Sequence, residues 1–541
     1  MLDKIVQRIG EVTGWLDERL SYVLIPGLLL TGLFLTLRLG FIQLRKFGHG
    51  LLVTSGKLDK AGHTGDVSHF QALTTALSAT VGVGNIAGVA MAIHFGGPGA
   101  LFWMWVTAFF GSALKYTECT LALHYRDINP NESSGAVSGG PMYYMAKGLK
   151  MPKLAAVFAG GLLIASLFTG NAIQANTMAD VLSSDLGVPT YITGLVSAAL
   201  VAAVILGGIH RIGHVSSILA PGMAVIYIAG ALGVLVAHYE MILPAFATIF
   251  EGAFNPVAGL TGVGAGAMLT TLTWGVKRGL YSNEAGQGSA PIAHAAARTE
   301  EPVSEGTVAL LEPFIDTIIV CTLTGLVLVV TGAWDMRFPT AMPVSEITFV
   351  DDTLTHETGR SVRDPAKFQH GTLDQLFVDA ARTTPFEGVL SHDANGITLA
   401  TAASGEAITT LYGDAVEVGA PLTARAFQMG LSRWVSWGNF LVALCVVLFA
   451  ISTAISWSYY GDRCAMYLWG HKAILPYKIT FVILHFIGAT APIHGIWSIG
   501  DVSLSLCTLP NIFALILLSP QIKRLTDSYF ARRPWEHESP T

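Results

Sequence analysis

Charge is scarce in this sequence. Only 13% of its 541 residues are Asp, Glu, Lys or Arg, about half the share found in soluble globular proteins. The formal net charge of −6 argues against a nucleic-acid partner, which requires a strongly basic surface. Hydrophobic residues make up 52% of the chain, and the mean hydropathy is +0.54. This composition indicates an integral membrane protein whose surroundings are the lipid bilayer.

Signatures of catalysis are missing as well. The five cysteines lie in or beside apolar runs at no spacing typical of metal ligands, and we interpret them as buried hydrophobic residues. No glycine-rich loop ends in Lys-Ser or Lys-Thr, which argues against ATP as the energy source. Gly82-x-Gly84 follows no predicted strand, so a dinucleotide site is not expected. With no evident set of nucleophile and base, the sequence does not indicate an enzyme.

In place of charged residues and catalytic motifs, the sequence has long apolar runs. A membrane-spanning helix needs about 20 mostly apolar residues, and the chain offers eleven such runs. We therefore predict an all-α polytopic membrane protein with about eleven transmembrane helices. The predicted spans are 21–38, 71–94, 98–123, 154–180, 189–208, 216–237, 261–295, 307–332, 432–459, 472–490 and 493–519.

Basic residues between the spans predict the orientation. They gather in alternate connections, for example at Arg45, Lys46 and Lys147, and the side rich in Lys and Arg is the cytoplasm. We expect a multi-pass protein of the cell inner membrane with its N-terminus outside and its C-terminus inside. Residues 1–20 would form an outer segment, and residues 520–541 a cytoplasmic tail.

One long polar segment interrupts the membrane pattern. Residues 334–430 hold 13 Asp and Glu against 6 Lys and Arg, and the orientation places them on the outer side. Gly388–Val418 alternates β-branched and polar residues around a turn signal at Asn395–Gly396. We predict a small, partly β-structured insertion outside the cytoplasm, with a disordered loop as the alternative.

Two spans contain glycines that a helix interior disfavours. They read ALSATVGVGNIAGVA over 76–90 and TWGVKRGLYSNEAGQGSAP over 273–291. Gly84-x-x-x-Gly88 has an alternative explanation as a small-residue packing motif between membrane helices. Close packing alone does not require the polar residues nearby, and polar groups inside a membrane indicate function. These polar residues are Thr80, Asn85, Lys277, Arg278, Asn283 and Glu284.

The order of the spans adds to the significance of these two sites. If helix 21–38 is set aside, the two glycine-rich spans open two halves of five helices each, 71–237 and 261–332 with 432–519. An odd number of spans gives the halves opposite topology. Interrupted helices at matching places in inverted halves are typical of a transporter's substrate and ion sites.

Several motifs resemble those of the alanine or glycine:cation symporter family, the sodium:alanine symporters. They are FQALTTALSATVGVGNIAGVA from Phe70, GGPMYYM from Gly139, NAIQAN from Asn171, WGVKRGLYSNEAGQGSAPIAHAAA from Trp274, EPFIDT from Glu312 and FAISTAISWSYYGDRC from Phe449. The resemblance implies a leucine-transporter-like fold of two inverted five-helix repeats, here preceded by one extra helix. The insertion before Ala420 departs from the family pattern, in which this connection is expected to be much shorter.

The resemblance also implies where the substrate binds. Backbone N–H groups from Gly82 through Val83 to Gly84 would receive the substrate carboxylate. A second break, expected at Trp274 and Gly275, would face them and offer carbonyl groups to the ammonium. Trp274 would limit the size of the side chain, or else serve packing alone. The remaining predicted substrate contacts are Thr80, Asn85, Phe168, Asn171 and Gln174, for which hydrogen bonding between helices is the alternative at Asn171 and Gln174.

A sodium site is implied between the first and eighth core helices. Its ligands would be the carbonyls of Ser78, Val81 and Phe449 and the hydroxyls of Ser452 and Thr453. Hydroxyls in membrane helices commonly bond to their own helix instead. The intramembrane charges, including those near Glu284, we interpret as ion pairs or an inner gate rather than substrate contacts.

The function predicted from this reasoning is sodium-coupled symport of alanine or glycine into the cell by alternating access, with sodium carried along as the coupling ion. Proton coupling, a different small amino acid, a channel and a membrane nutrient sensor remain as alternatives. No oligomeric state is predicted.

Overall fold

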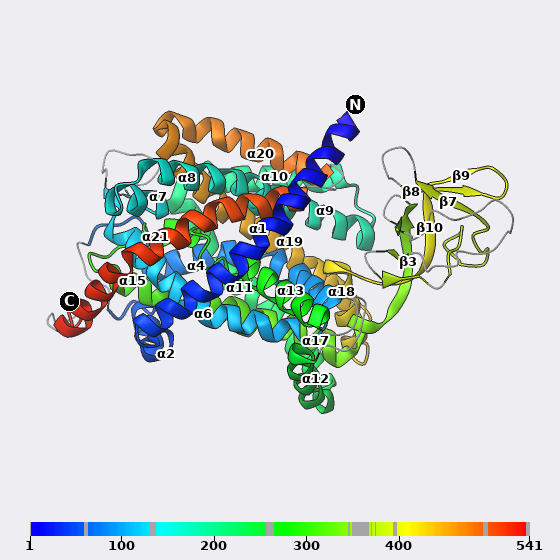
Figure 1. Ribbon diagram of the computed structural model, residues 1–541, viewed down its shortest axis with the longest axis horizontal. Coiled ribbons are helices and arrows are strands. Elements are labelled where there is room, and N and C mark those ends of the chain that lie inside the picture. Colours follow the sequence, from blue (N-terminus) through cyan, green and yellow to red (C-terminus); the bar gives the residue numbers. More distant parts are fainter. Residues whose placement is uncertain are drawn as a thin grey trace.

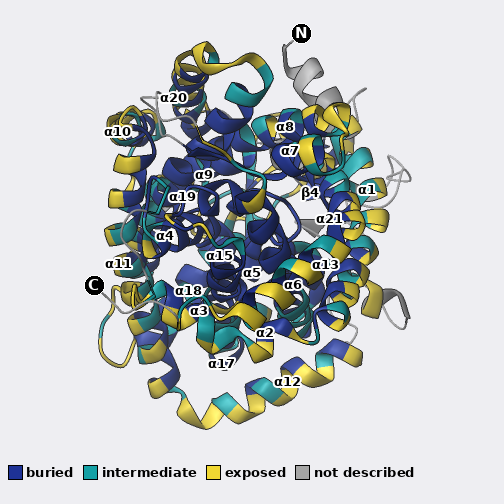
Figure 2. Ribbon diagram, turned by 90° about the vertical axis from the view of Figure 1, so that its left-hand side faces the viewer, coloured by how far each residue is buried: buried dark blue, intermediate teal, exposed yellow. Residues whose placement is uncertain are grey.

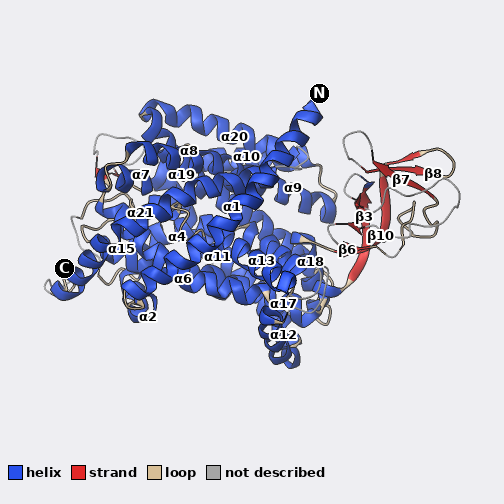
Figure 3. Ribbon diagram, viewed as in Figure 1, coloured by secondary structure: helices blue, strands red, loops and turns tan. Residues whose placement is uncertain are grey.

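The computed structural model describes residues 2–58, 63–128, 137–255, 265–344, 347–348, 367–368, 371–373, 375–392, 398–490 and 496–536. Helices build a bundle from which a small β segment projects (Figures 1 and 3). The helices of the first half are α1 (Leu2–Arg38), α2 (Ile42–Arg45), α3 (Phe47–Thr54), α4 (His69–Thr80), α5 (Val89–Gly96), α6 (Ala100–His124), α7 (Pro141–Tyr143), α8 (Pro152–Leu167), α9 (Ile173–Leu186), α10 (Thr190–Ile205), α11 (Gly208–Ala237) and α12 (Ile242–Phe254). Those of the second half are α13 (Ala265–Asn283), α14 (Ala290–His294), α15 (Pro302–Ala309), α16 (Leu311–Pro313), α17 (Thr322–Thr331), α18 (Gly419–Leu431), α19 (Gly438–Trp469), α20 (Ile474–Thr490) and α21 (Ile496–Arg532).

Four short π-helical stretches interrupt the long helices, namely η1 (Gly84–Gly88), η2 (Tyr144–Gly148), η3 (Phe168–Ala172) and η5 (Phe314–Cys321). Such stretches occur frequently at functional sites. Two of them, η1 and η3, fall in segments that carry predicted substrate contacts.

Seven helices within the described residues are long and apolar enough to cross a membrane, or eight if the bent pair α4 and η1–α5 counts as one span. The prediction of eleven is therefore not reproduced by length and hydropathy. The difference has a physical cause: α10 has only 16 residues, and α6 and α13 carry Lys115, Glu118, Lys277 and Arg278. Large apolar side chains such as Leu195 and Val225 are about two-thirds exposed, as expected of lipid-facing surfaces, while buried residues fill the centre (Figure 2).

Both ends of the chain extend their helices beyond the predicted limits. The sequence predicts a helix from residue 21, whereas α1 begins at Leu2 and runs without a break to Arg38. At the other end α21 continues past residue 519 to Arg532 despite Pro510 and Pro520. The guanidinium of Arg532 pairs with Glu301 at 2.8 Å and 2.9 Å, which fixes this helix end to the segment before α15.

Antiparallel strands lie between α17 and α18. Strand β3 (Arg337–Pro343) pairs with β10 (Thr410–Val416), and β7 (Gly388–His392) pairs with β8 (Thr398–Ala402). The predicted turn at Asn395–Gly396 lies outside the described residues. Four short strands complete the small sheets here, β4 (Ile347–Thr348), β5 (Lys367–Phe368), β6 (Gly371–Thr372) and β9 (Ala407–Ile408), while β1 (Asp127–Ile128) pairs with β2 (Val137–Ser138) elsewhere. The strands between α17 and α18 lie at the same end of the bundle as the N-terminus, and the C-terminus lies at the opposite end (Figure 1).

Candidate functional site

The first glycine-rich span is broken where the sequence predicts. Helix α4 starts with a capping box between Ser68 and Gln71 and ends at Thr80, and the chain then bends by 52° before η1 and α5. The amide of Gly82 donates to Asn85 Oδ1 at 2.8 Å. This contact matters because a backbone group freed inside a membrane protein must find a partner.

Asn85 stabilises the break rather than lining a cavity. Its Nδ2 donates to Asp316 Oδ1 at 2.5 Å and to Ser282 Oγ at 3.0 Å, and its carbonyl accepts from Thr324 Oγ1 at 2.8 Å. The side chain is fully buried. Asn85 therefore connects the first break to the end of α13, to η5 and to α17.

The second break lies at residues 284–289 and not at Trp274 and Gly275. Helix α13 runs through both of these residues to Asn283. Glu284, Gly286 and Gly288 then adopt positive φ angles of 55°, 82° and 80°. A left-handed backbone favours glycine, so Gly286 and Gly288 are the sequence feature that keeps the chain out of a helical conformation after Glu284.

Gly275 serves close packing between helices instead. A Cβ atom on it would lie 2.4 Å from the carbonyl oxygen of Ala100 on α6, and one on Gly279 would lie 3.2 Å from Met104 Cα. These two glycines form a small-residue seam between α13 and α6. Trp274 stacks on Phe95, with ring centroids 4.5 Å apart, and does not line the cavity between the breaks.

A small cavity of about 10 Å³ lies between the two breaks, with room for about one water molecule. It is lined by Ala79, Thr80, Gly82, Gly84, Thr169, Gln174, Tyr281, Glu284, Gln287, Thr453, Trp457 and Leu504. Four of the predicted substrate contacts are in this set, namely Thr80, Gly82, Gly84 and Gln174. The cavity therefore brings together residues from both halves of the chain.

In the sequence, Glu284 stands among the polar residues near the breaks and is predicted to serve ion pairing or an inner gate, whereas the structure places Glu284 at the cavity. Glu284 is the one charged side chain among the lining residues. Its Oε1 accepts from the indole N–H of Trp457 at 3.0 Å, and its Oε2 accepts from Ser289. The signal for a role at the cavity was the position of Glu284 two residues before Gly286, at the start of the segment that turns the chain.

The predicted span 154–180 contributes two residues to the cavity, Thr169 and Gln174, and directs Asn171 away from it. Gln174 Oε1 accepts from the amide of Val83 at 3.4 Å, and its Nε2 donates to the carbonyl of Thr169 at 3.1 Å. Asn171 instead donates to the carbonyl of Phe481 at 2.8 Å and contacts His485 at 2.7 Å. Asn171 therefore forms hydrogen bonds between helices, which was the alternative to substrate contact considered in the sequence analysis. Phe168 and the side chain of Val83 are not among the residues that line the cavity.

Oxygen atoms from α4 and α19 meet beside this cavity. Ser78 Oγ lies 2.5 Å from Ser452 Oγ, and Thr453 Oγ1 donates to the carbonyls of Ser78 and Ala79 at 3.2 Å each. The Thr453 hydroxyl therefore bonds across the helix interface rather than to its own helix. Val81 directly follows α4, and Phe449 lies one turn before Thr453 on α19.

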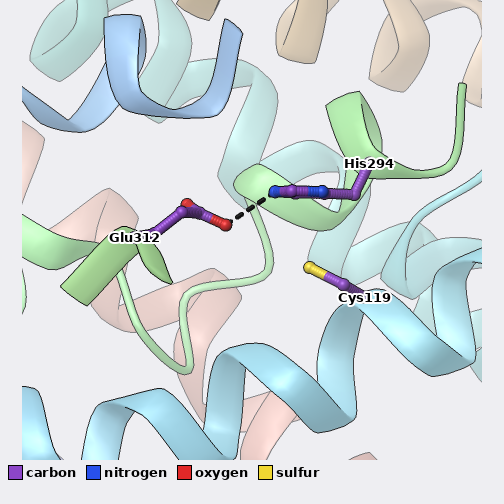
Figure 4. Close-up of side chains that lie close together, drawn as sticks. All are labelled: Cys119, His294 and Glu312. Atoms are coloured by element: carbon purple, nitrogen blue, oxygen red, sulfur yellow. Dashed lines mark hydrogen bonds and ion pairs between the residues drawn. The ribbon is translucent and has the colours of Figure 1, made fainter. Parts of the chain in front are cut away.

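A second polar cluster contains residue types that bind metals, but its hydrogen bonds and charges argue against a metal ion there. Ligand atoms of Cys119, His294 and Glu312 lie within 4.8 Å of one another (Figure 4). Both ring nitrogens of His294 already contact carboxylates, Glu305 at 2.5 Å and Glu312 at 2.7 Å. The ammonium of Lys115 lies 3.0 Å from Glu312 and would repel a metal cation. We interpret the cluster as a network of ion pairs.

Comparison with known proteins decides the family. The model of the sodium:alanine symporter family matches residues 3–365 and 396–541. The chain belongs to this family. It is therefore a multi-pass membrane transporter and not an enzyme. Residues 366–395, inside the predicted insertion, lie outside this match.

Several members of the sodium:alanine symporter family are similar to the chain over most of its length. The sodium/alanine symporter AgcS of Methanococcus maripaludis is 41% identical over 509 residues, 93% of each chain. The putative sodium/proton-dependent alanine carrier YrbD of Bacillus subtilis is 31% identical, over 90% of this chain and 85% of that protein. The probable sodium/glutamine symporter GlnT of the same organism is 29% identical, over 95% and 89%.

A solved structure supports the expected fold. The crystal structure of MhsT in complex with L-phenylalanine has a TM-score of 0.50 and 11% sequence identity, and the match covers 84% of this chain and 90% of that one. At this identity the likeness concerns the fold alone. It agrees with the leucine-transporter-like architecture implied by the sequence.

Proposed function

We propose that the protein is a secondary active transporter that carries alanine or glycine into the cell together with sodium, by alternating access. The observation that supports this best is the cavity between the two breaks, which adjoins the oxygen cluster of α4 and α19 through Thr453. Thr453 then contacts both the substrate cavity and the proposed ion ligands. A contact of this kind would let the binding of one solute affect the binding of the other, which coupled transport requires. We also retain the predicted orientation, with the β segment and N-terminus outside.

The substrate would lie between the breaks with its charged groups at opposite sides. Its carboxylate would meet the amides of residues 82–84 at the start of η1, where Gln174 holds the Val83 amide by a long bond of 3.4 Å that a carboxylate would replace. Its ammonium would meet Glu284, which replaces the carbonyls at Trp274 in our prediction from the sequence. Trp457 and Tyr281 would limit the side chain to a very small one, the role that we first expected of Trp274.

Sodium would bind where α4 and α19 meet. The donor atoms on offer are the hydroxyls of Ser452 and Thr453 and the carbonyls of Ser78 and Ala79. Neutral oxygens suit a monovalent cation that must be released again. The carbonyls of Val81, directly after α4, and of Phe449, on α19, stay part of the proposed ligand set because they flank these groups.

The test is uptake of labelled alanine by proteoliposomes. An inward sodium gradient should drive accumulation, whereas an equal potassium gradient should not. Because a zwitterion with one Na⁺ moves one net positive charge, an inside-negative potential should increase the initial rate. Uptake that never exceeds the outside concentration under a sodium gradient would contradict symport and favour a channel.

Proton coupling is the second candidate, and one feature favours it. Glu284 places an ionisable group inside the cavity, and a carboxylate at this depth is the kind of residue that proton-coupled carriers use. A pH gradient without sodium separates the two candidates in the same vesicles. Accumulation under that condition, abolished in Glu284→Gln, would assign the coupling to protons.

A further inference from the structure

A chain of buried ionisable side chains lies beside the second break and has no part in the transport cycle proposed above. It runs from His69 on α4 through Glu305, His294 and Glu312 to Lys115 on α6. His69 is 4% exposed and the other four are fully buried. Charges without access to water must balance one another, because an unpaired buried charge is strongly destabilising.

The hydrogen bonds of His294 show how many protons Glu305, His294 and Glu312 must hold together. Its Nδ1 lies 2.5 Å from Glu305 Oε1, and its Nε2 lies 2.7 Å from Glu312 Oε1. A carboxylate only accepts hydrogen bonds, while a neutral imidazole has one N–H and one accepting nitrogen. Both contacts are satisfied only when the three groups together hold one proton more than a neutral imidazole between two carboxylates. The count is the same whether the proton resides on the ring or on a carboxyl.

The charges give the same result. With that proton bound, the positive charges of Lys115 and the imidazolium balance the two carboxylates. Lys115 contacts the second oxygen of Glu312 at 3.0 Å, and His69 contacts the second oxygen of Glu305. Without the proton, Lys115 alone balances two carboxylates within the set of Lys115, Glu312, His294 and Glu305. His294 would also turn an accepting nitrogen toward a carboxylate oxygen.

The other ionisable groups on the elements packed against His294 have partners of their own. Glu118 on α6 accepts from Asn511 and from the amide of Gly286. Asp462 and Arg463 on α19 pair at 2.8 Å. Arg126, after α6, donates to backbone carbonyls, including that of Ala297 at 2.8 Å. The remaining neighbour, the thiol of Cys119, is a weak donor. Arg126 also interacts with the charge of Glu305, and Lys115 with those of Glu118 and Glu284. The proton count therefore rests on the two hydrogen bonds of His294.

We propose that the Glu305–His294–Glu312 unit is a proton-binding site that fixes the His69 end of α4 against α15. When the proton leaves, the two carboxylates repel one another and the contact through His69 weakens. The first broken helix is then free to move at that end. This site is independent of which ion drives transport, because it involves neither Thr453 nor the cavity.

Thermal unfolding of the purified full-length protein, followed from about pH 6 to about pH 9, tests the proposal without any transported solute. The folded state would hold a proton that an unfolded histidine releases above about pH 7, so stability should fall as the pH rises. We expect the unfolding midpoint of the wild-type protein to fall by at least about 2 °C over this range.

Two substitutions should remove this dependence and still fold. In Glu312→Gln, a neutral His294 can donate to Glu305 and accept from the new amide, whose oxygen accepts from Lys115. In Glu305→Gln the same pattern forms in the opposite direction, with His69 donating to the amide oxygen. Each variant satisfies its hydrogen bonds and balances its charges with no additional proton, so its midpoint should change less with pH.

His485→Gln is the matched control. His485 is fully buried like His294, but its partners Asn171 and Ser197, at 2.7 Å and 3.1 Å, are neutral groups that donate or accept. Above about pH 7.5, where a histidine is neutral in the unfolded chain as well, this variant should keep the pH slope of the wild-type protein. If Glu312→Gln and Glu305→Gln keep that slope too, the cluster binds no exchangeable proton and the proposal is wrong.

Discussion

Gly82 lies between the cavity and the proposed sodium ligands, and replacing it by alanine should weaken sodium binding selectively. A Cβ atom at this position would lie 2.6 Å from Thr453 Oγ1, far closer than non-bonded atoms approach. Thr453 cannot move away freely, because its hydroxyl already donates to the carbonyls of Ser78 and Ala79. The added methyl group would therefore displace the one side chain that joins ion and substrate.

The expected magnitude follows from overpacking, which costs typically about 1–3 kcal/mol in a well-packed interior. If about 1.4 kcal/mol of this strain is relieved when sodium is absent, the sodium concentration for half-maximal uptake rises about tenfold. Alanine affinity at saturating sodium should change less, because Thr453 only borders the cavity.

Sodium-dependent alanine uptake in proteoliposomes measures both constants. Gly88→Ala in the same broken span is the control, since its Cβ would have Arg278 Cδ at 3.9 Å as its nearest neighbour, an ordinary contact. In the double variant Gly82→Ala with Thr453→Ala, the collision disappears, so the two effects should not add. Wild-type sodium dependence in Gly82→Ala, or strict additivity in the double variant, would refute this account of the site.

Three further predictions concern other parts of the molecule. Gly275→Ala should lower the thermal unfolding midpoint by the equivalent of about 1–3 kcal/mol, because its Cβ would lie 2.4 Å from the carbonyl oxygen of Ala100; substrate preference in competition assays should not change. Trp457→Phe should let larger amino acids compete with alanine uptake, and an unchanged competition profile would remove this residue from the size limit. Burial, together with the charge of Lys46, lowers the pKa of His49 to about 4, so its packing against Tyr529 contributes fully above about pH 6.5 and is lost as the pH falls toward 4. Cleavage of the C-terminal helix end by a protease should accordingly be faster at pH 5 than at pH 7.5 in the wild-type protein, and His49→Phe should reduce the difference.

The sequence predicted the membrane class, the family and the first break well, because each depends on local composition. Gly82, Asn85 and the residues around them stand alone in an apolar run, so their deviation from helical preference is visible without a structure. The second break was misplaced because glycine has two uses in membrane helices. Gly275 permits close contact with α6, whereas Gly286 and Gly288 adopt positive φ angles. The sequence alone does not show whether a glycine is needed for close packing or for its backbone conformation.

Helix orientation was the other limit. Asn171 and Gln174 are three residues apart and both polar, yet Gln174 borders the cavity and Asn171 bonds to α20. Choosing between them requires the rotation of the helix, which η3 alters by its wider turn. The His294 cluster was also invisible, since its members are separated by up to 236 residues and no spacing rule connects them.

The seam of Gly275 and Gly279 has a practical consequence for anyone who wishes to watch this transporter at work. Backbone-to-backbone contact leaves no flexible side chain between α6 and α13 to absorb sliding, so the two helices travel together. Spectroscopic labels placed one on each would report a constant separation throughout the cycle. A second pair of labels, one on α13 and one on α15, would lie on either side of residues 284–289, where the backbone is not helical. A movement at the second break should change the distance between these two labels.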